Sequence, residues 1–256
     1  MAQQSGDKLA WITGGATGIG FASAKALGAA GFKVVISGRR AEELDKAVAT
    51  LAASGVTAQS QPLDVSDAAA VQALADAILA EHGRIDALVL SAGTNIPNRA
   101  WKNLTPEAFA RVSAINLNGV AYCVSAVMPA MRKAASGTIV VVSSWGGWRF
   151  LPFTGAAYGA TKMGLAPIVE SINYEECHHG IRASLVCPGE VATPILRSRP
   201  LPPPEEDIAR MLQPEDVASG IAYAVTAPPR VCINELVIAP SWNRIYLGAD
   251  DLKTKR

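Results

Sequence analysis

The chain has 256 residues, of which half are hydrophobic and 18% are charged. This length and composition predict a single α/β domain over residues 1–256 with one well-buried core. The 23 basic and 22 acidic residues give a formal net charge of +1, and no basic cluster is present. This balance argues against nucleic-acid binding as the main function.

The cysteines and histidines do not form a metal-binding or disulfide pattern. No C-x-x-C motif occurs, and the adjacent His178 and His179 would point apart on a helix, so no metal site is predicted. The N-terminus is polar, without the apolar region of a secretory signal, and no apolar run was expected to reach membrane length. We therefore expect a cytoplasmic protein with no membrane segment. The thiols expected to stay reduced are Cys123, Cys177, Cys187 and Cys232.

The first motif is a glycine turn between a strand and a helix. An apolar strand over residues 9–13 leads into Gly-Gly-Ala-Thr-Gly-Ile-Gly at 14–20, and a helix-forming run follows from 21 to 30. Glycines permit a tight turn in which backbone N–H groups reach a pyrophosphate, and the helix start adds its positive dipole end. The alternative is an ordinary turn. The predicted phosphate-binding residues are Gly14, Thr17, Gly18, Ile19 and Gly20.

The second strand, residues 33–37, is followed by Gly38, Arg39 and Arg40. Dinucleotide folds that select NAD usually place a carboxylate here for the ribose 2′-hydroxyl. A guanidinium suits a 2′-phosphate instead, so Arg39 and Arg40 favour NADP over NAD. The alternative is a solvated pair of arginines at a helix start.

Strands and helices alternate through the rest of the chain, which predicts a doubly wound, mostly parallel sheet of seven strands. Pro129 should interrupt the helix predicted over 105–134. Pro167 should kink the helix predicted over 155–178 at a cost of ~3 kcal/mol unless it is accommodated. The proline-rich loop over 193–213 is expected to be a lid and not a domain boundary. Further strands are predicted over 57–63, 86–90, 138–142, 181–187 and 232–238, and helices over 42–54, 66–82, 105–134 and 155–178.

A candidate catalytic group follows the strand over 138–142. Ser143 and Ser144 lie at its C-terminal end, where open α/β sheets place their active sites. Tyr158 and Lys162 are four residues apart and share a helix face. A lysine ammonium one turn away lowers the pKa of a phenol from its usual ~10 toward a useful range. Taken alone, the pair also fits a solvated lysine beside a half-buried tyrosine.

Taken in order, these motifs resemble the short-chain dehydrogenase/reductase family over about residues 8–240. The resemblance implies a single Rossmann-like domain. It also implies an NADP(H)-dependent oxidoreductase that interconverts a carbonyl compound and its alcohol. The motifs that carry it are Thr13-Gly14-x-x-x-Gly18-x-Gly20, Asp64, Ala92-Gly93, Asn116, Ser144, Tyr158-x-x-x-Lys162 and Pro188-Gly189.

The family's roles can be carried over residue by residue. The resemblance makes Tyr158 the acid/base, Lys162 the group that lowers its pKa and binds the nicotinamide ribose, and Ser144 the hydrogen-bond partner of the substrate oxygen. Asn116 would hold a water in a proton relay. The cofactor-binding residues implied, beyond the glycine turn and the two arginines, are Asp64, Val65, Ala92, Gly93, Tyr158, Lys162, Pro188, Gly189, Val191 and Thr193.

Three departures from the family pattern are visible. Ser91 replaces the usual asparagine before Ala-Gly, and the Ser144–Tyr158 spacing is one residue longer than the commonest form, which leaves Ser143 as an alternative catalytic serine. The segment 233–240 lacks the common Asp-Gly-Gly ending. It is similar to the subgroup of NADP-dependent serine and 3-hydroxy acid dehydrogenases and clavaldehyde-type reductases.

Loop residues should shape the substrate pocket. Arg149 and Arg197 are candidates to meet a carboxylate, or are solvated. The helices over 105–134 and 155–178 are commonly paired between subunits in the family, so a homodimer or homotetramer is expected. A catalytically silent NADP-binding regulator or scaffold and an epimerase or dehydratase are the competing functions. The candidate substrate residues, for which packing or a subunit interface is the alternative, are Ile96, Trp145, Trp148, Phe150, Phe153 and Glu190.

Overall fold

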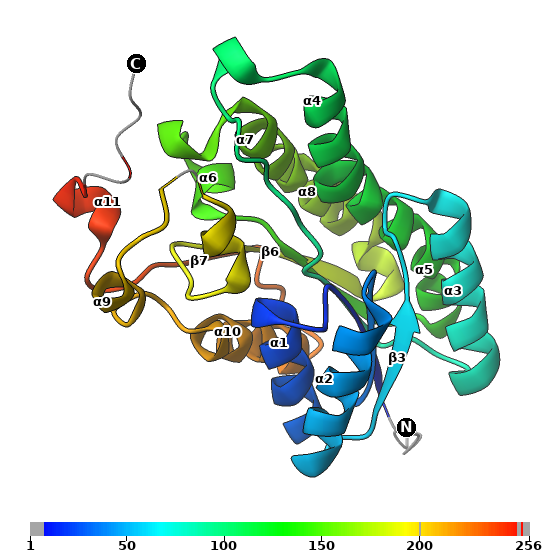
Figure 1. Ribbon diagram of the computed structural model, residues 1–256. Helices are drawn as coiled ribbons and strands as arrows, with labels where there is room; N and C mark the ends of the chain where they lie inside the picture. The colour runs from blue at the N-terminus through cyan, green and yellow to red at the C-terminus, as the bar shows by residue number, and fades with distance from the viewer. Residues whose placement is uncertain (1–7, 200, 250–251, 253–256) are drawn as a thin grey trace.

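The computed structural model describes residues 8–199, 201–249 and 252 (Figure 1). Seven strands form one parallel sheet in the order β3-β2-β1-β4-β5-β6-β7. The predicted seven-stranded, doubly wound sheet is therefore confirmed, and every pairing in it is parallel. The strands are β1 (Leu9–Thr13), β2 (Lys33–Gly38), β3 (Ala58–Pro62), β4 (Ala87–Leu90), β5 (Gly137–Val142), β6 (Ile181–Pro188) and β7 (Glu235–Ile238).

Helices cover both faces of the sheet (Figure 1). The chain moves outward from β1 to β3 and then returns to place β4 on the other side of β1, so the sheet has a switch point between β1 and β4 where ligands of such folds bind. The helices are α1 (Gly18–Ala29), α2 (Ala41–Ala53), α3 (Ala68–His82), α4 (Pro106–Ser113), α5 (Gly119–Ala134), α6 (Trp145–Trp148), α7 (Ala156–Met163), α8 (Leu165–Glu176), α9 (Glu205–Ile208), α10 (Pro214–Thr226) and α11 (Arg244–Leu247).

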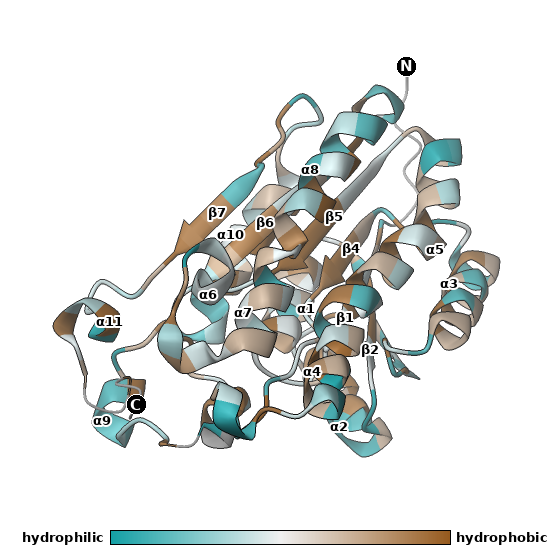
Figure 2. Ribbon diagram, turned by 90° about the horizontal axis from the view of Figure 1, so that it is seen from above, coloured by the Kyte–Doolittle hydropathy of each residue, from teal (hydrophilic) through white to brown (hydrophobic). Residues whose placement is uncertain are grey.

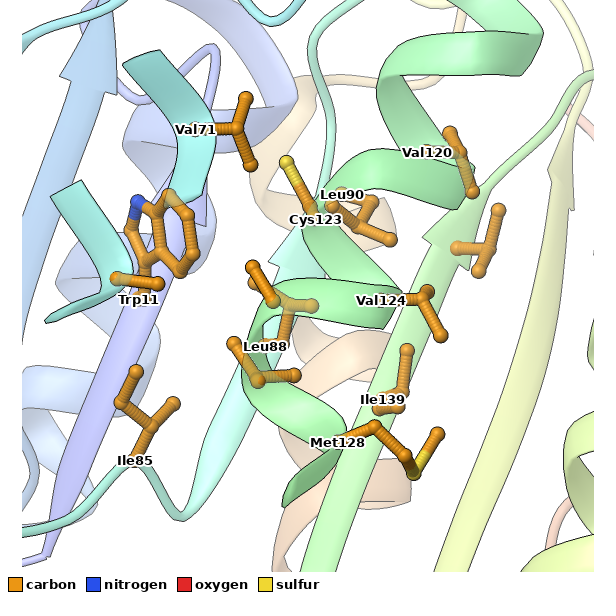
Figure 3. Close-up of a cluster of buried hydrophobic side chains, with 14 of the residues drawn as sticks. Trp11, Val71, Ile85, Leu88, Leu90, Val120, Cys123, Val124, Met128 and Ile139 are labelled. Carbon is orange, nitrogen blue, oxygen red and sulfur yellow. The ribbon is translucent and has the colours of Figure 1, made fainter. Parts of the chain in front are cut away.

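The alternation of side chains along each strand divides the core into two layers. In β1, Leu9 and Trp11 pack with α3, α5 and α8, whereas Ala10 and Ile12 pack with α1, α2 and α10. The strands are apolar along much of their length because both faces are buried, as Figure 2 shows. Figure 3 shows the first layer, in which Trp11 lies near Val71 of α3, while Ile139 of β5 lies at the far side of the cluster.

The segment predicted as one helix over 155–178 is divided into α7 and α8 at Gly164. Pro167 explains the break, because its ring would clash with the carbonyl of the residue four positions back, which is Met163 at the end of α7. Pro167 therefore lies in the first turn of α8, where its missing N–H is tolerated. The predicted disruption of the helix is present, and its cost in free energy is small.

The segment predicted as one helix over 105–134 also differs from a regular helix. Thr105 caps α4 by accepting a hydrogen bond from the Ala108 N–H at 3.2 Å, as expected. A π-turn over Ala114–Asn118 then separates α4 from α5. The expected interruption at Pro129 is wrong, because α5 continues through it. Pro129 and Ser125, whose carbonyl loses its helical partner, are both exposed, so water can serve that carbonyl.

The stretch Pro106–Ala134 is long and apolar enough, by length and composition, to cross a membrane. The expectation that no apolar run reaches that length is therefore wrong. Half of its most apolar window is buried inside the fold, where α5 supplies Cys123, Val127 and Met131 to the core. A core helix satisfies the same criteria as a membrane span, because both must bury an apolar surface.

Candidate active site

A cavity opens at the carboxyl ends of β1, β4, β5 and β6. The glycine turn forms one side, the start of α6 and the helix α7 form another, and the segment after β6 closes it. Of the predicted site residues, those that line it are Gly14, Thr17, Gly18, Ile19, Ala92, Gly93, Ser144, Trp145, Phe153, Tyr158, Lys162, Pro188, Gly189, Glu190, Val191 and Thr193. Those that lie outside its lining are Gly20, Arg39, Arg40, Asp64, Val65, Ile96, Asn116, Trp148 and Phe150.

The two serines after β5 make different contacts. Ser143 is buried, and its hydroxyl donates to the backbone oxygen of Lys162 at 2.9 Å. Ser144 caps α6, where its oxygen accepts from the Gly146 N–H at 3.1 Å, and its side chain lies close enough to Tyr158 to act on the pKa of the phenol. Ser144 is therefore the serine that contacts the phenol, and Ser143 holds the helix that carries Lys162.

The side chain of Lys162 comes from the turn of α7 that follows Tyr158. Its ammonium donates to the backbone oxygen of Val142 at 2.8 Å and lies 5.9 Å from the centroid of the Tyr158 ring. Burial lowers the pKa of Lys162 to about 8. The ammonium is thus fixed at the end of β5 and remains largely protonated at neutral pH.

The expectation that Lys162 lowers the pKa of Tyr158 is wrong in this structure: that pKa is raised above its ordinary value, mainly because burial disfavours the phenolate. The hydrogen bond to Ser144 and then the positive charges of Arg99 and Arg199 act in the opposite direction. Two arginines that the sequence motifs did not single out therefore lie close enough to influence the phenol electrostatically.

Asn116 lies in the π-turn and is fully buried. Its carbonyl oxygen accepts from the Thr94 N–H at 2.8 Å, and its amide nitrogen donates to the Thr94 oxygen at 2.9 Å and to the Thr161 hydroxyl at 3.3 Å. A single π-turn in a long helix is frequent at functional sites. Here it brings Asn116 between the loop after β4 and the helix α7.

The glycine turn can be this tight only because side chains are missing. A Cβ on Gly14, whose φ is +67°, would lie 2.9 Å from the backbone of Ala92, and a Cβ on Gly20 would lie 2.2 Å from the Gly14 oxygen. Thr17, at the N-cap of α1, forms no capping hydrogen bond through its side chain in the described chain. The first N–H groups of α1 are therefore not satisfied by that cap, which fits the pyrophosphate of a dinucleotide.

Arg39 and Arg40 are both exposed after β2. Across the edge of the sheet, the hydroxyl of Ser66 donates to Asp64 at 2.7 Å, and its backbone N–H donates to the same oxygen at 3.0 Å. These bonds lower the pKa of Asp64, and the positive charges of Arg39 and Arg111 lower it further. Arg39 and Asp64 thus lie near one another beyond the glycine turn, whereas Arg40 is the N-cap residue of α2.

Arginines and acids form a network beside the cavity. Glu190, which is buried, accepts from Arg199 at 2.6 Å and from Arg244 at 3.1 Å. Arg244 also donates to Asp207 at 2.9 Å. The network joins the segment after β6, the lid and α11, and sequence spacing gave no signal for it because these residues come from three separate loops.

The candidate substrate residues divide into two groups. Trp145 and Phe153 line the cavity, whereas Phe150 is 71% exposed and Trp148 stacks with Arg149, whose guanidinium carbon lies 4.2 Å from the ring centroid. The side chain of Arg197 lies outside the described residues. Among residues 8–199, 201–249 and 252, no group of three histidine, cysteine or acidic side chains is placed to hold a metal ion.

Comparison with known proteins places the chain in one class, the nucleotide-dependent dehydrogenases and reductases. The profile of the family described as short chain dehydrogenase matches residues 8–202. The chain belongs to this short-chain dehydrogenase/reductase family and is an NAD(P)-dependent enzyme of it.

Individual relatives cover nearly the whole chain. An uncharacterized oxidoreductase of Listeria innocua is 31% identical over 92% of this chain and 97% of its own length. The cis-4-hydroxycyclohexanecarboxylate dehydrogenase of Sinomonas cyclohexanicum is 36% identical over 87% of this chain and 91% of its own. The alcohol dehydrogenase of the archaeon Thermococcus sibiricus, solved with 5-hydroxy-NADP, has a TM-score of 0.82 and 28% identity, and covers 93% of this chain and 98% of that chain.

Proposed function

We propose that the protein is an NADP(H)-dependent oxidoreductase that interconverts a carbonyl compound and its alcohol, with Ser144, Tyr158, Lys162 and Asn116 as its catalytic set. The observation that carries the proposal is that Ser144, Tyr158 and Lys162 lie together on the wall of one cavity, whose other side is the glycine turn. A family member without this set would be a regulator or scaffold, and here the set is complete.

Bound NADP(H) supplies the hydride in such a reaction. In the reducing direction, Tyr158 gives its phenolic proton to the carbonyl oxygen as carbon gains the hydride, and in the oxidising direction it takes the hydroxyl proton back. Ser144 hydrogen-bonds the same oxygen, which orients it and stabilises its developing negative charge. Because burial raises the pKa of Tyr158, the phenol holds its proton at neutral pH and is ready to donate it.

Lys162 and Asn116 lie behind the tyrosine. The Lys162 ammonium, fixed on the Val142 oxygen, favours the phenolate that forms when Tyr158 gives up its proton. A Cβ on Gly93 would lie 3.5 Å from both the Lys162 ammonium and the Asn116 oxygen, so the two polar groups face the same glycine. This arrangement supports a route along which Tyr158 recovers its proton.

The proposal includes a preference for NADP over NAD. Arg39 follows β2 at the position where the adenosine ribose is expected, and its charge acts on Asp64, the residue expected to contact adenine. A guanidinium there binds a 2′-phosphate through charge-assisted hydrogen bonds. The relatives solved with NADP or 5-hydroxy-NADP support the same preference.

The remaining parts of the proposal concern location and assembly. We propose a cytoplasmic homodimer or homotetramer. All four cysteines are free thiols, which fits a reducing compartment. A shallow groove between α5 and α8, lined by Val124, Met128 and Ile172 among others, is a surface for pairing these helices with a second copy.

The test is a spectrophotometric screen of NADPH oxidation against ketones, aldehydes and oxo acids, with NADH in parallel. On the substrate found, Tyr158→Phe keeps the ring but removes the proton donor. Turnover should then fall by at least ~10²-fold, the range of a positioned acid–base group, while NADPH binding is kept. If Tyr158→Phe retains most of the activity, the assignment of the acid/base is wrong.

A further inference from the structure

Two guanidinium groups line the active-site cavity beside Tyr158. Arg99 comes from the loop after β4, and Arg199 follows the short helix over Pro194–Ser198 in the lid. The charges of both act on the phenol. Burial, and next the charge of Arg199, lowers the pKa of Arg99 to about 10. The three groups therefore form one cluster, in which the two guanidinium groups lie close together.

The charges in this cluster are not balanced. The described residues that line the cavity include three cations, Arg99, Lys162 and Arg199, and one carboxylate, Glu190. Glu190 is already bound to Arg199 and shared with Arg244. Arg99 has only carbonyl partners in the part of the chain that the structure describes. An excess of positive charge thus faces the cavity next to the proton donor.

Arg99 is held firmly in this position. Its Nε donates to the Ile96 oxygen at 2.7 Å, and a terminal nitrogen donates to the Phe153 oxygen at 3.3 Å. Its backbone packs against Gly155, where a Cβ would lie 2.6 Å from the Cβ of Arg99. Gly155, with a φ of +81°, is the residue from which α7 begins. The guanidinium is therefore fixed against the start of the helix that carries Tyr158.

A half-buried guanidinium without an acidic partner is costly to maintain unless a ligand supplies the opposite charge. In a small molecule that carries no phosphate or sulfate, the anionic group that best matches the geometry of a guanidinium is a carboxylate. The wall of the same cavity includes the apolar side chains of Leu151 and Phe153. These would contact a hydrocarbon segment between the carboxylate and the reacting carbon.

We infer that the substrate carries a carboxylate, which Arg99 binds with Arg199 beside it, so that the enzyme interconverts an oxo acid and a hydroxy acid. The inference rests on the proposed function and adds to it the charged group that selects the substrate. Arg99 is the principal anchor, because Arg199 already has Glu190 as its partner. Binding energy from this remote group orients the carbonyl oxygen toward Ser144 and Tyr158.

The test uses a series of oxo acids of increasing chain length, each measured beside its own methyl ester. The reacting carbonyl is the same in each pair, and only the charge differs. For the best chain length, kcat/KM should be higher for the acid. In Arg99→Gln it should fall by ~10- to 100-fold for the acid, the loss expected for a charge-assisted hydrogen bond, and stay unchanged for the ester. Arg149→Gln, which changes an exposed arginine outside the cavity lining, should leave both unchanged.

A second measurement does not depend on turnover. Calorimetry compares binding of cyclohexanecarboxylate and of cyclohexanecarboxamide to the protein with NADP present. The carboxylate should bind more tightly in the wild type, and Arg99→Gln should abolish the difference. Equal kcat/KM for acid and ester at every chain length, or a carboxylate affinity that Arg99→Gln leaves intact, would overturn the inference. Absence of all turnover contradicts the proposed function instead. In that case the calorimetric comparison still decides whether Arg99 binds a carboxylate.

Discussion

Adjacent residues at the end of β5 divide two tasks. Ser143 donates to the backbone oxygen of Lys162, while Ser144 caps α6 and acts on the pKa of Tyr158. A Cβ on Gly147 would lie 2.3 Å from the Ser143 hydroxyl and 2.7 Å from the Lys162 oxygen. The end of β5, α6 and α7 are therefore packed around the hydrogen bond from the Ser143 hydroxyl to the Lys162 oxygen. This packing fixes Lys162 relative to Tyr158.

We also expect single residues to decide the choice of cofactor. Arg39→Ala should weaken NADP binding by ~10- to 100-fold, because a charge-assisted hydrogen bond contributes ~1.5–3 kcal/mol, while NAD binding changes little. Gly38→Asp should turn the preference toward NAD by repelling the 2′-phosphate. The substitution fits the fold, since the nearest atom to a Cβ on Gly38, in Leu44, lies 3.8 Å away. Fluorescence titration with both cofactors measures the effect.

Arg40→Ala is the matched control for this pair of variants, because Arg40 is equally exposed and starts α2. It should weaken NADP binding less than Arg39→Ala does. Wild-type protein that binds NAD as tightly as NADP would show instead that the two arginines are solvated and play no part in cofactor choice.

At the scale of the element, the break between α7 and α8 converts an unfavourable proline into a tolerated one. A proline inside a continuous helix costs ~3 kcal/mol, whereas one in the first turn costs little. Pro167→Ala should therefore change the free energy of unfolding by less than ~1 kcal/mol, measured by urea denaturation. A gain near ~3 kcal/mol would mean that Pro167 strains a continuous helix. Ala166→Gly, in the same turn, reports how sensitive this turn is to helix propensity.

The regular elements could be predicted from the sequence because burial on both faces of a parallel sheet leaves a strong apolar pattern. β1, β2 and β5 lie within a residue of their predicted positions. β7 is shorter than predicted, beginning at Glu235 and not at Cys232. The Tyr158 and Lys162 pair could be predicted because both lie on one short helix, where spacing determines which side chains meet.

The arginines of the cavity could not be predicted in the same way. Arg99 and Arg199 lie in segments that follow two different strands, β4 and β6, and loop conformation leaves no periodic signal in the sequence. Arg149 and Arg197 were the arginines named from the sequence, but Arg149 stacks on Trp148 outside the cavity lining. Tertiary packing, such as the contact of Arg99 with Gly155, decides which arginine faces the ligand.

At the scale of the whole molecule, the groove on α5 and α8 predicts self-association. Ile168→Glu adds a negative charge to this groove, which already holds Glu175 and Glu176, and should shift the protein toward a single-chain mass in light scattering, because an unpaired charge buried at an interface costs several kcal/mol. Lys46→Glu, which changes an exposed residue of α2, is the control and should leave the mass unchanged. A single-chain mass for the wild type at micromolar concentration would contradict the assembly.

The network of Glu190, Arg199, Asp207 and Arg244 has a consequence for engineering. Figure 1 shows α9 and α11 close together, and Arg244, only 1% exposed, binds Asp207 across them. Replacing residues 193–213 alone would remove two of these four charges and leave a buried guanidinium and carboxylate with fewer partners, a change that is strongly destabilising. The unit that can be transplanted between family members is therefore the lid together with α11, although a whole strand and α10 separate the two along the chain.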